Sequence, residues 1–196
     1  MTQIQNFKMY IDGQWVASES GKTIETLNPE TNEVWATVPE ANEEDVDKAV
    51  KAAHNAFNGS WSKLYPKERS KFLRNIGNQL RENAEHLGKV ETIDTGKLFK
   101  EIKSQAIYIA EYYDYYAGLA DKVEGTVVPI DKPDMQVITT RIPIGVIAAI
   151  IPWNSQMLLT AVKLAPALAM GNTVVIKASE LAPVTLLEFA KLIEKS

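Results

Sequence analysis

Two short apolar runs late in the sequence constrain the fold more than any other feature. Residues 146–151 and 173–176 are almost entirely apolar, which is typical of strands covered on both faces of a sheet. A helix-like segment at residues 157–170 lies between them, and a second helix follows at residues 186–195. This order of strand, helix, strand and helix predicts the start of a doubly wound parallel sheet, so the fold class is α/β. Two such strands alone leave open edges, which indicates an incomplete sheet.

The residues before this unit carry the patterns of hairpins and a ribbon. Residues 8–17 alternate around Asp12-Gly13, a pair that suits a tight turn with positive φ, and residues 26–38 predict a second pair of strands. Residues 126–142 alternate like a two-stranded ribbon with a turn in its middle.

Four helices are expected between the hairpins and the ribbon. Asn42 can cap the first of them, with Asp45 at its third position. Its apolar residues fall on one face at helical spacing: Val46, Val50, Ala53 and Phe57. The pattern changes near residues 125 and 144, which divides the chain into residues 1–124, 125–143 and 144–196.

Composition and charge exclude several classes of protein. The absence of cysteine excludes a disulfide framework and a thiolate zinc site, and His54 and His86 lack ligand-spaced partners, so we expect surface histidines and no metal. The net charge is −4 without a basic cluster, so we expect no nucleic-acid partner. Residues 1–20 resemble no signal peptide, and the longest apolar stretch, residues 142–153, is too short to cross a bilayer. We therefore expect a soluble, cytoplasmic protein with no membrane partner.

Polar residues follow both predicted parallel strands at the point where each strand ends. Asn154 comes after the first strand, and Lys177 and Glu180 come after the second. Ligands of open α/β sheets bind at the carboxyl ends of strands, where an exposed amide can donate to a developing negative charge. A lysine and a glutamate at the same edge can hold a ribose, because the ammonium donates to its hydroxyl groups and the carboxylate accepts from them.

Each of these residues also has a plainer interpretation. Asn154 alone would most often be a helix cap, and Lys177 and Glu180 could be surface residues at a helix start, where glutamate suits the dipole. Trp153 could belong to the core, to a pocket wall or to both.

Two other groups of residues invite a functional interpretation and are better explained by structure. Five tyrosines could stack on bases, but their helical spacing favours packing or subunit contact: Tyr108, Tyr112, Tyr113, Tyr115 and Tyr116. Glu91 and Asp94 could form a paired-carboxylate site, but with Lys97 nearby we expect a solvated helix face.

Several segments together resemble one family. The segment Pro152-Trp153-Asn154 and the strand Gly171-Asn172-Thr173-Val174 leading to Lys177-Ala178-Ser179-Glu180 are similar to motifs of the aldehyde dehydrogenase superfamily. Four further segments resemble that family in order and spacing: Asp12-Gly13-Gln14-Trp15, Asn28-Pro29, Glu91-Thr92-x-Asp94-x-Gly96-Lys97 and Pro143-x-Gly145-Val146. The resemblance covers nearly the whole chain, as the amino-terminal part of such an enzyme, although each motif alone would be a weak signal.

The resemblance implies an oxidoreductase that oxidises an aldehyde to a carboxylic acid with NAD or NADP. Asn154 would be the side-chain donor of the oxyanion hole. The implied cofactor-binding residues are Ile150, Ile151, Pro152 and Trp153 along the nicotinamide and ribose path, with Lys177, Ser179 and Glu180 after the second strand. Of these, Lys177 and Glu180 would bind the adenosine ribose. Glu180 favours NAD, since a carboxylate repels a 2′-phosphate, whereas Lys177 could accept that phosphate.

The resemblance also implies a role for each part of the chain. Residues 1–124 would belong to the cofactor-binding domain, with hairpins and helices, and residues 125–143 would form a protruding β-ribbon that joins subunits of a homo-oligomer. Residues 144–196 would begin the Rossmann-like βαβα unit, leaving the sheet incomplete and the catalytic domain absent.

The sequence departs from the family in two respects. Such enzymes attack the aldehyde with a cysteine and hydrolyse the thioester with a glutamate, both of which lie beyond residue 196 in the family. Ser155-Gln156 also stands where many members carry an aromatic residue and a proline, which leaves the shape of the aldehyde channel open. The chain is therefore expected to be inactive by itself. The alternative is a non-catalytic fragment or interaction module that associates with full-length subunits.

Overall fold

The computed structural model describes residues 4–196 and begins with two small sheets. One sheet has the order β1-β5-β4, with these bounds: β1 (Gln5–Asn6), β4 (Thr23–Asn28) and β5 (Glu33–Pro39). The other is the hairpin of β2 (Met9–Ile11) and β3 (Gln14–Val16). Asp12 and Gly13 have φ angles of 52° and 74°, so the predicted turn with positive φ is confirmed.

Four helices and one short 3₁₀ turn follow the sheets. Their bounds are α1 (Glu43–Asn58), η1 (Trp61–Lys63), α2 (Pro66–Glu82), α3 (Ala84–Thr95) and α4 (Phe99–Leu119). The side chain of Asn42 accepts from the backbone of Asp45, whose carboxylate accepts from the backbone of Asn42, so the expected cap of α1 is confirmed. The predicted apolar face of α1 is less covered than a core face, because Val46 and Val50 are exposed.

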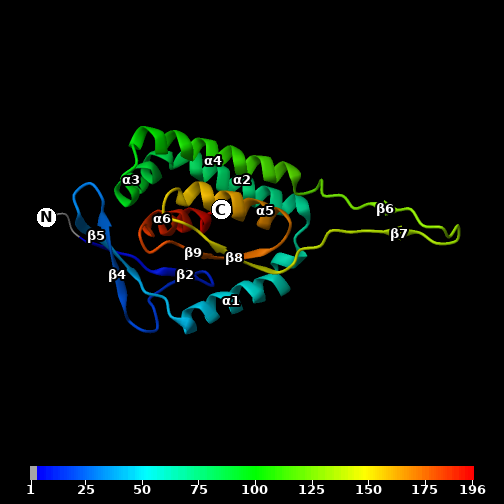
Figure 1. Ribbon diagram of the computed structural model, residues 1–196, viewed down its shortest axis with the longest axis horizontal. Helices are drawn as coiled ribbons and strands as arrows, with labels where there is room; N and C mark the ends of the chain where they lie inside the picture. Colours follow the sequence, from blue (N-terminus) through cyan, green and yellow to red (C-terminus); the bar gives the residue numbers. More distant parts are fainter. Residues whose placement is uncertain (1–3) are drawn as a thin grey trace.

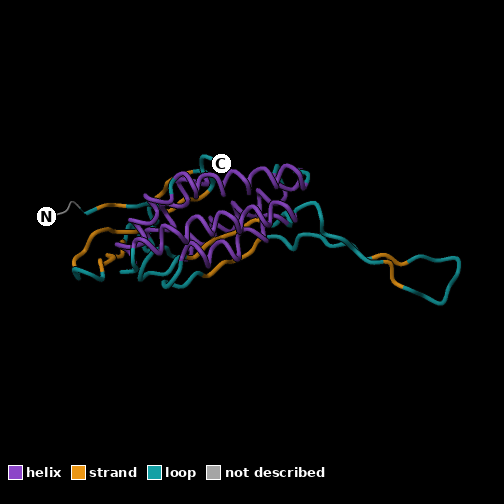
Figure 2. Tube along the Cα trace, turned by 90° about the horizontal axis from the view of Figure 1, so that it is seen from above, coloured by secondary structure: helices purple, strands orange, loops and turns teal. Residues whose placement is uncertain are grey.

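The ribbon is the most extended part of the molecule. It contains β6 (Val127–Val128) and β7 (Val137–Ile138), which pair antiparallel and project far from the body (Figures 1 and 2). The paired strands are much shorter than the alternation over residues 126–142 predicts. No other described element packs against the ribbon to extend the pairing.

The last part of the chain has the predicted order of strand, helix, strand and helix. These elements are β8 (Val146–Ile150), α5 (Gln156–Ala169), β9 (Thr173–Lys177) and α6 (Val184–Ile193). Strands β8 and β9 pair in parallel and lie between α1 on one side and α5 and α6 on the other (Figure 1). The expectation of strands covered on both faces is only partly met, because Ile150 is 71% exposed. Strand β8 therefore keeps an uncovered edge and face within the described residues.

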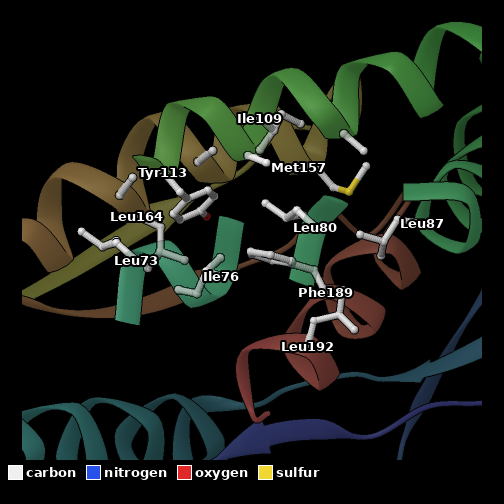
Figure 3. Close-up of a cluster of buried hydrophobic side chains, with 14 of the residues drawn as sticks. Leu73, Ile76, Leu80, Leu87, Ile109, Tyr113, Met157, Leu164, Phe189 and Leu192 are labelled. Atoms are coloured by element: carbon white, nitrogen blue, oxygen red, sulfur yellow. The ribbon is translucent and has the colours of Figure 1, made fainter. Parts of the chain in front are cut away.

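A helical core holds α5 in place. Side chains from α2, α4, α5 and α6 pack together in one buried cluster (Figure 3): Leu73, Ile76, Leu80, Ile109, Tyr113, Met157, Leu164, Phe189 and Leu192. The rings of Tyr113 and Phe189 lie 6.3 Å apart, centre to centre. Because α5 is anchored along most of its length, the position of its first residues is fixed by this packing. No helix among residues 4–196 combines the length and the apolar character that a bilayer crossing requires.

The core contains one tyrosine, Tyr113, whose hydroxyl lacks a hydrogen-bond partner among the described residues. Tyr113 is fully buried, and burial raises the pKa of that hydroxyl. We expect Tyr113→Phe to raise the free energy of unfolding by about 1 kcal/mol, since it removes an unpaired polar atom and keeps the ring. Thermal melts of the variant and of the exposed-site control Tyr108→Phe check this. A lower melting temperature for Tyr113→Phe alone would contradict it.

Candidate cofactor-binding and catalytic site

The parallel register of β8 and β9 brings the predicted site residues to one edge of the sheet. Ile150 is paired with Lys177, and the backbone N–H of Ile151 donates to the carbonyl of Lys177 at 3.0 Å. The segments that follow β8 and β9 therefore both begin at the same edge of the sheet. Residues 152–154 and 178–180 both start from this carboxyl-end edge of the sheet, where ligands of such sheets bind.

The predicted residues after β8 divide into exposed and buried ones. Ile150, Pro152 and Trp153 are exposed and can form the wall of a binding surface. Ile151 is only 1% exposed and packs with Ala149 and Leu186, so its side chain points into the core, away from this surface. The difference follows from the strand period of two, which turns neighbouring side chains to opposite faces. Trp153, at 52% exposed, is a surface residue and not a core residue among the described residues.

Asn154 stands in an exposed turn between β8 and α5. The N-cap of α5 is Ser155, so the plainer interpretation of Asn154 as the helix cap does not hold. The amide of Asn154 makes no side-chain hydrogen bond to another described residue, and it remains available to a ligand at the edge.

Lys177 and Glu180 form an exposed pair after β9. The ammonium nitrogen of Lys177 donates to Oε2 of Glu180 at 2.7 Å, and this hydrogen bond lowers the pKa of the glutamate. Ser179 differs from them because it is buried, and its Oγ accepts from the backbone N–H of Leu181 at 3.3 Å. Ser179 thus shapes the turn that presents the lysine and the glutamate.

The expectation of a solvated face at Glu91 and Asp94 is wrong. Glu91 is 0% exposed and Asp94 is 2% exposed, because α3 packs between α4 and α6 and turns this face inward. Oδ2 of Asp94 accepts from both the backbone N–H and the hydroxyl of Thr185, each at 3.0 Å, and so satisfies the first turn of α6. Burial raises the pKa of Glu91 to about 7 and that of Asp94 to about 6.

Lys97 is a residue near the site that the sequence interpretation did not single out. Its ammonium nitrogen donates to Oγ of Ser155 at 2.6 Å and lies 3.7 Å from Oε1 of Glu91. The neighbouring Gln156 is fully buried, and its amide donates to the carbonyl of Ala182. The sequence named Lys97 as a charge near Glu91 and Asp94 and as the end of a family motif. It did not reveal the contact with Ser155, because the two residues are 58 positions apart.

The predicted histidines and tyrosines lie outside this site. His54 and His86 are surface residues, and His86 pairs with Glu188 of α6 at 2.9 Å. Of the tyrosines, Tyr113 is in the core, whereas Tyr116 contacts both Tyr112 and Tyr115 along α4.

Comparison with known proteins identifies the architecture. A model of the aldehyde dehydrogenase family matches residues 15–196. The chain belongs to the aldehyde dehydrogenase family. The α/β fold and the family that the motifs predicted are both confirmed.

Individual relatives give the extent of this similarity. The chain is 51% identical over 194 residues to a (Z)-2-((N-methylformamido)methylene)-5-hydroxybutyrolactone dehydrogenase of Acinetobacter baylyi, covering 98% of the chain and 39% of that relative. It is 42% identical over 189 residues to a betaine aldehyde dehydrogenase of Bacillus subtilis, covering 96% of the chain and 39% of the relative. An aldehyde dehydrogenase structure from Bacillus cereus matches with a TM-score of 0.94 and 39% identity, covering 97% of this chain and 39% of that one. The chain thus spans about two fifths of the length of these aldehyde dehydrogenases.

Proposed function

We propose that the protein to which these residues belong oxidises an aldehyde to a carboxylic acid and reduces a nicotinamide cofactor. The observation that carries the proposal is the pairing of Ile150 with Lys177, because the segments with Asn154 and with the Lys177–Glu180 pair then leave the sheet at the same edge. An oxyanion donor and a ribose-binding pair at one edge are what this reaction requires. Membership of the family supports the same activity.

In this mechanism the chain stabilises charge and holds ligands. The Asn154 amide donates to the oxyanion that forms when a thiolate adds to the aldehyde carbonyl. Lys177 and Glu180 hold the ribose hydroxyls, while Ile150, Pro152 and Trp153 form an apolar wall beside them. The cofactor, when bound, supplies the hydride acceptor. The thiol and the general base come from sequence outside these residues, which contain no cysteine.

The exposed Lys177–Glu180 pair fits a nicotinamide dinucleotide, and we propose NAD as the cofactor. Its carboxylate accepts from the ribose hydroxyls of NAD and repels the 2′-phosphate of NADP. Structural relatives have been solved with both types of ligand. A betaine aldehyde dehydrogenase from Staphylococcus aureus, with a TM-score of 0.92, is in complex with NAD⁺, and a 3,6-anhydro-L-galactose dehydrogenase with the same score is in complex with NAP.

The cofactor proposal predicts a specific loss of affinity. Glu180→Ala removes the ribose acceptor, so we expect the Kd for NAD to rise about tenfold, as the loss of a hydrogen bond to a charged group would give. Fluorescence titration with NAD, with the exposed Glu111→Ala as the matched control, measures the change. An unchanged Kd would remove Glu180 from the cofactor site.

We also propose that identical subunits associate through residues 125–143 in the cytoplasm. The ribbon exposes Val127 and Ile138 at 65% and 63%, which is apolar surface suited to burial against another subunit. The absence of cysteine agrees with a reducing compartment.

The complete enzyme tests the activity. It consists of these 196 residues with the sequence that supplies the thiol and the base, taken if necessary from the rest of the A. baylyi relative. We expect aldehyde-dependent NADH formation from this protein and none from the 196 residues alone. The exposed apolar ribbon favours a second function, a non-catalytic module that binds full-length subunits. An inactive complete enzyme together with co-purification of the short chain with full-length subunits would favour the module.

A further inference from the structure

A donor-rich polar pair lies directly beside Asn154. We propose that Lys97 and Ser155 form an anion-recognition point, and that the aldehyde oxidised by this enzyme carries a carboxylate. The inference rests on the proposed function, because that function places the aldehyde next to Asn154. It adds the chemical class of the substrate.

Ser155 presents a hydroxyl that is not used by its own helix. It occupies the N-cap of α5, yet its side chain makes no capping hydrogen bond. Its Oγ instead accepts from the Lys97 ammonium at 2.6 Å. Because an ammonium group only donates, the hydroxyl proton of Ser155 is not used in this contact and can be donated to another acceptor.

The end of α3 delivers Lys97 to this position. Gly96 follows the helix with a φ of 76°, and an added Cβ would meet Cγ of Pro29 at 3.0 Å. A glycine is therefore required for the chain to leave α3 toward Ser155. The side chain of Lys97 is 29% exposed, and its amine contacts Ser155 at the start of α5.

Glu91 attracts the ammonium of Lys97 as an ion-pair partner but accepts no hydrogen bond from it. Its carboxylate is buried beneath Lys97, and the distance of 3.7 Å between Oε1 and the amine is too long for a hydrogen bond. The nearby Asp94 is occupied by Thr185 of α6. One of the three N–H donors of Lys97 is thus directed to Ser155, and its charge is shared with Glu91 through the ion pair. The other two N–H donors make no hydrogen bond to a described residue, and we propose that a ligand accepts from them.

The group that complements this pair is an ionised carboxylate. Lys97 offers two N–H donors and Ser155 offers one O–H donor, and a carboxylate is an acceptor only. Hydrogen bonds between an ammonium and a carboxylate are assisted by charge and are stronger than those to a neutral hydroxyl. An aldehyde with a carboxylate at its far end therefore fits better than its neutral analogues.

Kinetics with three aldehydes of equal length test this inference on the complete enzyme. The probes are succinic semialdehyde, 4-hydroxybutanal, in which a primary alcohol replaces the carboxylate, and butanal. We expect kcat/KM to be about tenfold higher for the semialdehyde than for either neutral aldehyde, as one charge-assisted hydrogen bond would give. Equal values for all three would overturn the inference and leave the proposed function intact, whereas no turnover of any aldehyde would remove the proposed function itself.

Variants of Lys97 separate recognition from folding. Lys97→Met should lower kcat/KM for the semialdehyde about tenfold relative to kcat/KM for butanal, while Lys97→Arg restores most of the preference. Lys97→Met leaves the Glu91 carboxylate buried and unpaired, which can impair folding. The double variant Lys97→Met/Glu91→Gln removes that carboxylate, so it should fold and show the same loss of preference for the semialdehyde. Lys100→Met, on an exposed part of α4, is the matched control. Retained preference for the semialdehyde in the folded double variant would overturn the inference.

Discussion

Replacing Asn154 by alanine is expected to lower kcat of the complete enzyme by about 10²–10³-fold, the usual effect of removing one oxyanion-hole donor. Asn154 lies in the exposed turn that precedes the N-cap of α5, and its backbone position is set by β8 and by the helical core that holds α5. The substitution removes the amide from an exposed position, so the fold should be unaffected. Steady-state kinetics with a saturating cofactor measure the change.

The specificity of this loss distinguishes catalysis from binding. The amide contributes only when negative charge develops on the carbonyl oxygen, so kcat should fall while the Kd for NAD stays within about twofold. Asn78→Ala, at an exposed position of α2, controls for the loss of an asparagine. A normal kcat for Asn154→Ala would contradict the oxyanion role and leave the ribose-binding proposal standing.

Local patterns predicted the elements of the fold and the sheet edge from which the candidate site residues leave. The Asp12-Gly13 turn, the Asn42–Asp45 cap and the parallel order of β8 and β9 each depend on residues near in sequence or on a general rule of chain topology. The pairing of Ile150 with Lys177 follows from that topology, because both strands end at the same edge.

Other features depend on contacts that a pattern cannot specify. Glu91 and Asp94 resemble a solvated face in spacing, and their burial is decided by α6, about ninety residues later, where Thr185 binds Asp94. The role of Lys97 is hidden for the same reason, since Ser155 is far away in sequence. The spacing of apolar residues placed Val46 and Val50 on one face of α1, but spacing does not show whether another element covers that face, and both side chains are exposed.

The buried carboxylate of Glu91 predicts a stability that changes with pH. Burial raises its pKa from 4.5 to about 7 in the folded state, so the folded protein binds this proton more tightly than the unfolded chain does. The stability that Glu91 contributes is therefore complete below pH 4.5 and is lost as the pH rises through about 7. The full difference amounts to about 3 kcal/mol.

Glu91→Gln removes this dependence, because glutamine stays neutral at every pH. We expect the variant to match the parent protein near pH 4.5 and to be more stable above about pH 7, by about 3 kcal/mol. Melting temperatures of both proteins across this range measure the difference. Glu111→Gln, at an exposed carboxylate of α4 that pairs with no described residue, controls for loss of charge. Equal melting temperatures of the variant and the parent protein at high pH would mean that the buried charge of Glu91 does not destabilise the fold. If the variant is more stable but discriminates less between anionic and neutral aldehydes, the charge of Glu91 lowers stability while it holds Lys97 at the substrate.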